Sequence, residues 1–148
     1  MYQQWMVEAS STSTRTRTLY GRTNKMTNPF RDQERFMTAC DQTVGEFNEG
    51  QFALYTNLIT EEHQELLEAT LSDDREEQLD ALIDILVVTV GAIHSMGADG
   101  EGAWNEVMRT NFAKIDPITG KVRKREDGKV LKPKGWTAPE LAPFLKKT

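Results

Sequence analysis

The chain has few of the residues that support disulfide, zinc or nucleophilic chemistry. Its 148 residues include a single cysteine, Cys40, and two histidines. One cysteine excludes an internal disulfide framework and leaves no paired-cysteine zinc motif, which favours a reducing, cytoplasmic compartment. No basic residue adjoins Cys40 to activate its thiol. The sequence also contains no glycine-rich phosphate loop and no Ser-His-Asp signature.

Long hydrophobic runs are also missing. The longest, residues 81–93, is interrupted by Asp84 and is shorter than the roughly 20 residues that a membrane-spanning helix needs. The first residues are polar and show no secretory signal pattern. We therefore expect a soluble protein with no membrane partner. Hydrophobic residues make up 38% of this single-domain chain, which is low for an independent core and favours burial by oligomerisation.

Charge is distributed unevenly along the chain. Residues 1–27 carry four basic and one acidic side chain, residues 28–116 carry five and nineteen, and residues 117–148 carry nine and three. An acidic centre between basic ends is poorly suited to wrapping DNA, so we expect no stable nucleic-acid binding. It is suited to a central metal site over which cations meet phosphates.

Hydrophobic periodicity and capping residues predict an all-α protein with four helices in an antiparallel core. Asn28-Pro29 is a helix-start signal, Gly97 ends the third helix, and Asp127-Gly128 predicts a short basic β-hairpin. The predicted helices cover residues 28–47, 52–69, 73–96 and 99–115. We divide the chain into a flexible Ser/Thr/Arg-rich arm (1–27), a helical catalytic domain (28–116), and a basic hairpin with an irregular tail (117–148).

Two carboxylate pairs, Glu62/Glu65 and Glu77/Asp80, are the main candidate site. Each pair has i,i+3 spacing, which places both side chains on one helical face. Two consecutive antiparallel helices could direct all four toward one point, and oxygen ligands are what Mg²⁺ prefers. A lone E-x-x-E is usually a solvated helix face. Here no Lys or Arg lies three or four residues from the first pair, and the second pair opens an apolar helix.

Asp84 lies one turn beyond Asp80, within the apolar run, and needs a compensating partner. That partner could be the metal cluster, or a cation such as Lys114 in a structural salt bridge, which we favour. His63 is expected to be exposed, and His94 to lie in a core or an interface.

A second constellation is cationic and follows the acidic one in the sequence. Arg and Lys are suited to phosphate oxygens, although such runs often serve only as a solubilising tail. Beside a Mg²⁺ site, we interpret them as a substrate-binding set with Asn111. This constellation comprises Arg109, Asn111, Lys114, Lys121, Arg123, Lys124, Arg125, Lys129 and Lys132.

The order of these motifs resembles the all-α nucleoside triphosphate pyrophosphohydrolases, which include MazG proteins, dimeric dUTPases and phosphoribosyl-ATP pyrophosphohydrolases. The resemblance rests on the two carboxylate pairs, on the run from Ala81 to Ala92, and on segments 107–114 and 125–133. The last two look like those of phosphoribosyl-ATP-pyrophosphohydrolase-like members, many of them phage-encoded. It covers residues 28–143, and we find no match before residue 28.

The resemblance implies that Glu62, Glu65, Glu77 and Asp80 hold Mg²⁺, with Mn²⁺ as a possible substitute, and that the enzyme converts a (d)NTP to a (d)NMP and pyrophosphate. It also implies a set of substrate-binding residues, in which the cations neutralise the phosphates and the amide hydrogen-bonds the substrate: Asn111, Lys114, Arg125, Lys129 and Lys132. It implies a homodimer or homotetramer, in the host cytoplasm if the gene belongs to a phage. The activity would control a nucleotide pool or serve one dNTP such as dGTP. Hydrolysis of phosphoribosyl-ATP and a non-enzymatic helical interaction module are the alternatives.

Overall fold

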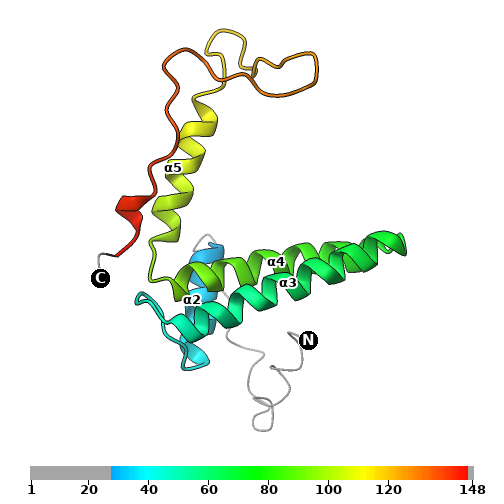
Figure 1. Ribbon diagram of the computed structural model, residues 1–148, viewed down its shortest axis with the longest axis vertical. Helices are drawn as coiled ribbons and strands as arrows, with labels where there is room; N and C mark the ends of the chain where they lie inside the picture. The colour runs from blue at the N-terminus through cyan, green and yellow to red at the C-terminus, as the bar shows by residue number, and fades with distance from the viewer. Residues whose placement is uncertain (1–27, 147–148) are drawn as a thin grey trace, which may run out of the picture.

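A computed structural model describes residues 28–146 and shows four α-helices and one short 3₁₀ helix (Figure 1). The predicted arm, residues 1–27, lies outside the described residues. The all-α class is confirmed. The elements are α2 (Pro29–Ala39), α3 (Glu49–Leu71), α4 (Arg75–Ser95), α5 (Gly100–Phe112) and η2 (Ala142–Phe144).

Helix α2 begins as the sequence predicts and ends eight residues earlier. The Asn28 side chain accepts a hydrogen bond from the Phe30 amide at 2.9 Å, with Pro29 in the first turn. The prediction that this helix reaches residue 47 is wrong, because Asp41 has a φ of 56° and turns the chain out of the helix. A connecting loop follows, and Asn48 caps α3 by accepting from the Gln51 amide.

Helices α3 and α4 form a long antiparallel pair joined by a tight turn (Figure 1). The turn uses Asp73 at a φ of 55°, and the Asp74 side chain accepts from the amides of Glu76 and Glu77. The cap is therefore Asp74, and α4 begins at Arg75. The short turn places the carboxylates of the two helices on neighbouring segments.

The core lies near the end of this pair that is remote from the turn. Met37 of α2, Tyr55 of α3, and Val88 and Ala92 of α4 form its buried centre. Gly91 allows the two long helices to approach closely there, since a Cβ at this position would lie 2.2 Å from the Tyr55 ring. The Tyr55 hydroxyl donates to the Gln42 side chain at 2.7 Å, which fixes the ring in that gap.

Nearer the turn, the same helix pair leaves large apolar side chains exposed. The wholly apolar second half of α4 predicts a buried central helix, and apart from Ala81 its buried residues do begin only at Val88. The exposed apolar residues nearer the turn are Leu67, Leu71, Leu79, Leu82, Ile83 and Leu86. By length and composition α4 could also cross a membrane. A helix buried between subunits of a soluble assembly has the same composition.

Helix α5 leaves the helix pair and runs alongside the C-terminal segment (Figure 1). Asp99 caps it by accepting from the Gly102 amide at 2.9 Å. The predicted four-helix core is therefore not closed within one chain. At the predicted hairpin the structure has one isolated antiparallel bridge, Lys124–Val130, and another, Ile115–Val122, closes the preceding turn. Residues 28–146 contain no strand, so the β-hairpin is not confirmed.

Candidate functional site

Glu62 is the most unusual side chain in the described part of the protein. It is 1% exposed, and neither carboxylate oxygen has a hydrogen-bond partner. Burial raises its pKa, and the nearby carboxylates of Glu65 and Asp84 raise it further. A buried carboxylate without donors costs several kcal/mol, roughly, unless it takes up a proton or a cation.

Asp84 faces this region from α4. It is half-buried, and its pKa is raised by burial first and then by the charges of Asp80 and Glu65. We favoured a structural salt bridge from Asp84 to a cation such as Lys114. That prediction is wrong, because Lys114 lies beyond the end of α5 and donates to Asn111 instead. Asp84 therefore belongs with the acidic residues.

The acidic cluster, with members on both long helices, is defined here as Glu62, Glu65, Asp80 and Asp84. The charges of Glu65, Asp80 and Asp84 raise the pKa of Glu62 or of Asp84, and Glu61 adds a smaller contribution to that of Glu62. Glu77, the remaining predicted metal ligand, lies one turn nearer the helix start and does not contribute to the raised pKa values. It lines an open hollow of about 410 Å³ with Asp80 and apolar side chains of the same helix.

The acidic cluster fits a divalent cation by its donor set rather than by finished coordination geometry. Within residues 28–146, no three Asp, Glu, His or Cys side chains converge closely enough to hold an ion. Mutual repulsion of carboxylates opposes such convergence unless a cation is present. Among the described residues, the charged neighbours that shift the pKa of Glu62 are carboxylates, and its two unpaired oxygens are donors of the kind that Mg²⁺ takes.

The predicted substrate-binding residues separate into two groups. Asn111, Lys114 and Lys132 gather at the far end of α5, around Trp136 of the tail. The Lys132 and Lys114 ammonium nitrogens lie 4.2 Å and 5.2 Å from the centroid of the Trp136 ring. The Asn111 side chain accepts from the Lys114 ammonium at 2.9 Å.

Arg125 and Lys129 lie instead at the turn of residues 125–129. The Arg125 guanidinium forms an ion pair with Asp127, which lowers the pKa of that carboxyl, and the Lys129 amide also donates to it. Arg125 is thus partly neutralised within its own turn. Lys114 and Lys132 have no such carboxylate partner among the described ion pairs.

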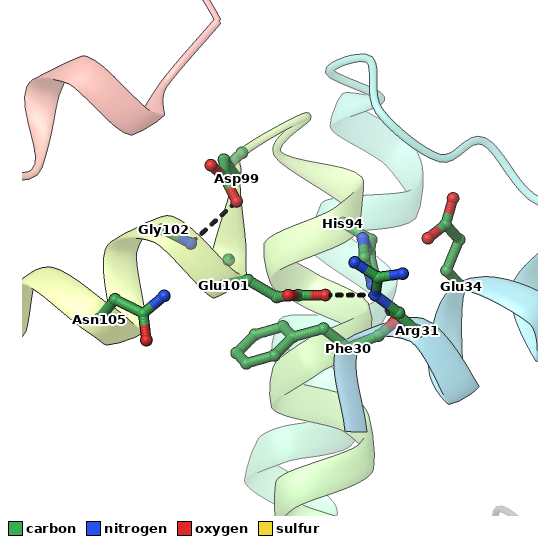
Figure 2. Close-up of a pocket in the computed structure, with 10 residues that line it drawn as sticks. Phe30, Arg31, Glu34, His94, Asp99, Glu101, Gly102 and Asn105 are labelled. Atoms are coloured by element: carbon green, nitrogen blue, oxygen red, sulfur yellow. Dashed lines mark hydrogen bonds and ion pairs between the residues drawn. The ribbon is translucent and has the colours of Figure 1, made fainter. Parts of the chain in front are cut away.

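A separate hollow of about 430 Å³ lies where α2, α4 and α5 meet, away from the acidic cluster (Figure 2). The Arg31 guanidinium forms an ion pair with Glu101 at 3.0 Å across it, and His94 is hydrogen-bonded to the Phe30 carbonyl at 2.8 Å. Three carboxylates, Glu34, Asp99 and Glu101, also line it. The single arginine is already paired, so this hollow is unsuited to a triphosphate.

The histidines are as expected: His94 is buried and His63 is exposed. Cys40 is exposed at the end of α2, rather than on a buried stripe.

Two features escaped sequence reasoning. We assigned Asp84 to a salt bridge. Counting residues outward in both directions from the turn at residue 73 nevertheless places Asp84 on α4 opposite Glu62 on α3. Trp136 was not considered, although a tryptophan within a lysine-rich segment is a recognisable signal for cation–π contacts.

The chain matches the family model described as phosphoribosyl-ATP pyrophosphohydrolase over residues 18–111, which is more than half its length. This match includes the acidic cluster, Glu77 and Asn111, and it ends before Lys114. It begins ten residues before residue 28, where we expected the resemblance to start. A search of curated proteins finds no match. The family hydrolyses phosphoric anhydride bonds with release of pyrophosphate. The chain therefore belongs to the phosphoribosyl-ATP pyrophosphohydrolase family, within the MazG-like all-α NTP pyrophosphohydrolase superfamily.

Proposed function

We propose that this protein is a Mg²⁺-dependent pyrophosphohydrolase that converts a (d)NTP and water to a (d)NMP and pyrophosphate. The observation that carries the proposal is Glu62, a buried carboxylate with two unpaired oxygens among further carboxylates. A bound cation would offset the cost of this burial, because no hydrogen bond or ion pair of the described residues does so.

The residues that would hold the metal are Glu62 and Glu65 on α3 with Asp80 and Asp84 on α4. Asp84 is included because burial and the charges of Asp80 and Glu65 raise its pKa, which places it within the acidic cluster. Glu77 lies one turn away and would act at the margin of the site. When bound, Mg²⁺, or Mn²⁺ in its place, polarises the phosphate and activates the attacking water.

The cationic residues would bind the phosphate chain and offset its charge as the anhydride bond breaks. Lys114 and Lys132 carry charges with no carboxylate partner among the described ion pairs, which suits this task. Asn111 would orient Lys114 through their hydrogen bond. Arg125 and Lys129, at the adjoining turn, would meet the distal end of the phosphate chain.

The cationic residues and the acidic cluster do not meet in one chain. Helix α5 is 13 residues, or about 20 Å, long and carries Lys114 away from the helix pair (Figure 1). We infer that a second copy brings them together in a homodimer or homotetramer. The exposed apolar half of α3 and α4 supports this, since Leu71 and Leu79 are 89% and 62% exposed.

A pyrophosphate-release assay tests the proposal. The wild-type protein is incubated with Mg²⁺ and each of the canonical NTPs and dNTPs, dGTP included. Glu65→Gln should lose most activity with its helical content retained. Glu68→Gln, one turn along the same helix, is the matched control, because Glu68 accepts only from Gln64 and should be dispensable. Equal activity of Glu65→Gln and wild type would contradict the metal assignment.

Phosphoribosyl-ATP is a second candidate substrate, favoured by the description of the matching family. It carries the same triphosphate and would use the same acidic and cationic residues. Including it in the panel separates the two, since the preferred substrate will have the highest kcat/KM. The family assignment also favours an enzyme over a helical interaction module.

A further inference from the structure

Trp136 makes three contacts that the proposed function leaves unexplained. Its indole N–H donates to the Thr110 carbonyl at 2.7 Å. Thr110 lies in the last turn of α5, where carbonyls have no partner within the helix. The indole satisfies one of these carbonyls and is thereby fixed at the end of α5.

The same indole ring holds two ammonium groups from different parts of the chain. Lys132 and Lys114 lie 4.2 Å and 5.2 Å from its centroid, both within the range of a cation–π contact. Their nitrogens cannot be farther apart than the sum of these distances. At 0.1 M salt that is within a Debye length of about 10 Å, so the two charges repel each other.

An aromatic face attracts a cation without neutralising it, whereas a carboxylate pairs with it. Arg109 and Arg125 illustrate the second case, since each is paired with a carboxylate close by in sequence. Lys114 and Lys132 instead contact an aromatic face, so both keep their charge for a ligand. Their positions on one ring suit an anion that carries several charges in a row.

We propose that Trp136 is a positioning residue that presents Lys114 and Lys132 as a paired-ammonium site for the polyphosphate chain of the substrate. This inference rests on the proposed function and adds the residue that organises its phosphate site. A nucleobase stacked on an indole face that carries an ammonium group would have to displace that lysine. The phosphate chain requires no such displacement, and each ammonium can donate to its oxygens.

The C-terminal segment keeps Trp136 in place through two further contacts along α5. The Glu140 amide donates to the Glu106 carboxylate at 3.1 Å, and the Asp99 amide donates to the Phe144 carbonyl at 2.9 Å. Arg109 also donates to Glu106, and together these donors lower the pKa of Glu106 to about 2. The anchoring carboxylate therefore stays ionised at neutral pH.

Calorimetric titration of the full-length, metal-free protein with inorganic tripolyphosphate tests the site without any catalysis. Trp136→Leu should weaken binding about five- to tenfold, because both cation–π contacts are lost. Trp136→Phe keeps an aromatic face and should restore most of the affinity. Lys132→Ala should weaken binding about fivefold or more. Lys134→Ala removes an equal charge two residues away and should change affinity less than about twofold.

Kinetics with the preferred nucleotide provide the second readout. Trp136→Leu should raise KM more than it lowers kcat, whereas loss of the fold would lower kcat and the melting temperature together. Tripolyphosphate affinity unchanged in Trp136→Leu, or equal in the Lys132 and Lys134 variants, overturns the inference. Trp136-dependent binding of single-stranded DNA without binding of tripolyphosphate also overturns it.

These outcomes are separate from those of the proposed function. If wild type binds tripolyphosphate through Trp136 but hydrolyses no nucleotide, the paired-ammonium site stands and the proposed enzyme activity fails. If it hydrolyses nucleotides but the Trp136 variants behave as wild type, the activity stands and the site fails.

Discussion

The acidic cluster on α3 and α4 and the cationic group at the end of α5 differ in how each tolerates unneutralised charge. The acidic residues are held on two rigid helices, and Glu62 is 1% exposed with no donor to its oxygens. The lysines are held at the surface by an aromatic ring that leaves their charge available. Burial on two helices and contact with an aromatic ring are therefore two different ways in which this fold holds like charges close together.

Loss of Asp84 should disable the acidic cluster while the cationic group stays intact. We expect Asp84→Asn to lower kcat/KM by about a hundredfold or more, because it removes a charge facing Glu62. Glu77→Gln should cost about tenfold or less, since Glu77 is not among the carboxylates that raise the pKa of Glu62 or Asp84. Initial rates of pyrophosphate release measure both. The reverse order would restore Glu77 as a ligand and return Asp84 to a supporting role.

Mixing two defective chains tests whether the two regions meet across a subunit boundary. Asp84→Asn lacks the acidic half, and the double variant Lys114→Ala/Lys132→Ala lacks the cationic half. In a symmetric dimer with shared sites, random exchange of subunits should restore about a quarter of wild-type activity. Mixtures that show only the sum of the two separate activities would place both halves of each site in one chain.

Charge on the exposed apolar face should separate the subunits. Leu82→Glu places a carboxylate among the exposed leucines of α3 and α4. We expect a smaller species in sedimentation velocity, and a loss of activity that partly recovers at high protein concentration. The matched control is Ile118→Glu, because Ile118 is 93% exposed in the loop beyond α5. If both variants keep the wild-type sedimentation coefficient, this face is not the interface.

The smallest expected effect is on stability, and its sign follows from the raised pKa values of Glu62 and Asp84. As pH rises, these groups ionise in the unfolded chain first. Metal-free protein should therefore lose stability from the ordinary carboxyl pKa upward until both groups are ionised in the folded state. Mg²⁺ should recover that loss. Thermal unfolding across pH, with and without Mg²⁺, measures this, and Glu62→Gln should flatten the profile. If Glu62→Gln leaves the pH dependence of the melting temperature unchanged, ionisation of Glu62 does not destabilise the folded protein.

Helix starts could be predicted from the sequence because their caps are local. Asn28 and Asp99 each accept from an amide two or three residues ahead, and neither bond depends on distant residues. The end of α2 could not be predicted in this way. Val44 and Phe47 continue its apolar spacing, yet the chain leaves the helix at Cys40 and is held by contacts from elsewhere. The Gln51 side chain accepts a hydrogen bond from the Thr43 amide in this loop, and it donates to the Thr43 carbonyl and to the Ser95 hydroxyl on α4.

The candidate site shows the same division. The i,i+3 spacing of Glu62 and Glu65 predicts that they share one face of α3, because helical periodicity is a local property. The match of Asp84 to Glu62 depends on the length of the turn between two helices. The gathering of Lys114 and Lys132 depends on where a distant tryptophan docks. Neither can be deduced from residue spacing within one element.

The close contact between Gly91 and Tyr55 has a consequence for the acidic cluster. Gly91 and Asp84 lie seven residues, or about two turns, apart on α4, and Tyr55 and Glu62 are equally spaced on α3. Gly91 with Tyr55, and Asp84 with Glu62, are therefore two layers of the same helix pair. The separation of the helices at Gly91 therefore fixes how far Asp84 lies from Glu62. Gly91→Ala, whose Cβ would overlap the Tyr55 ring, should spread both layers and weaken Mg²⁺ binding in a calorimetric titration. Affinity for the metal would then be adjustable at a residue that has no side chain.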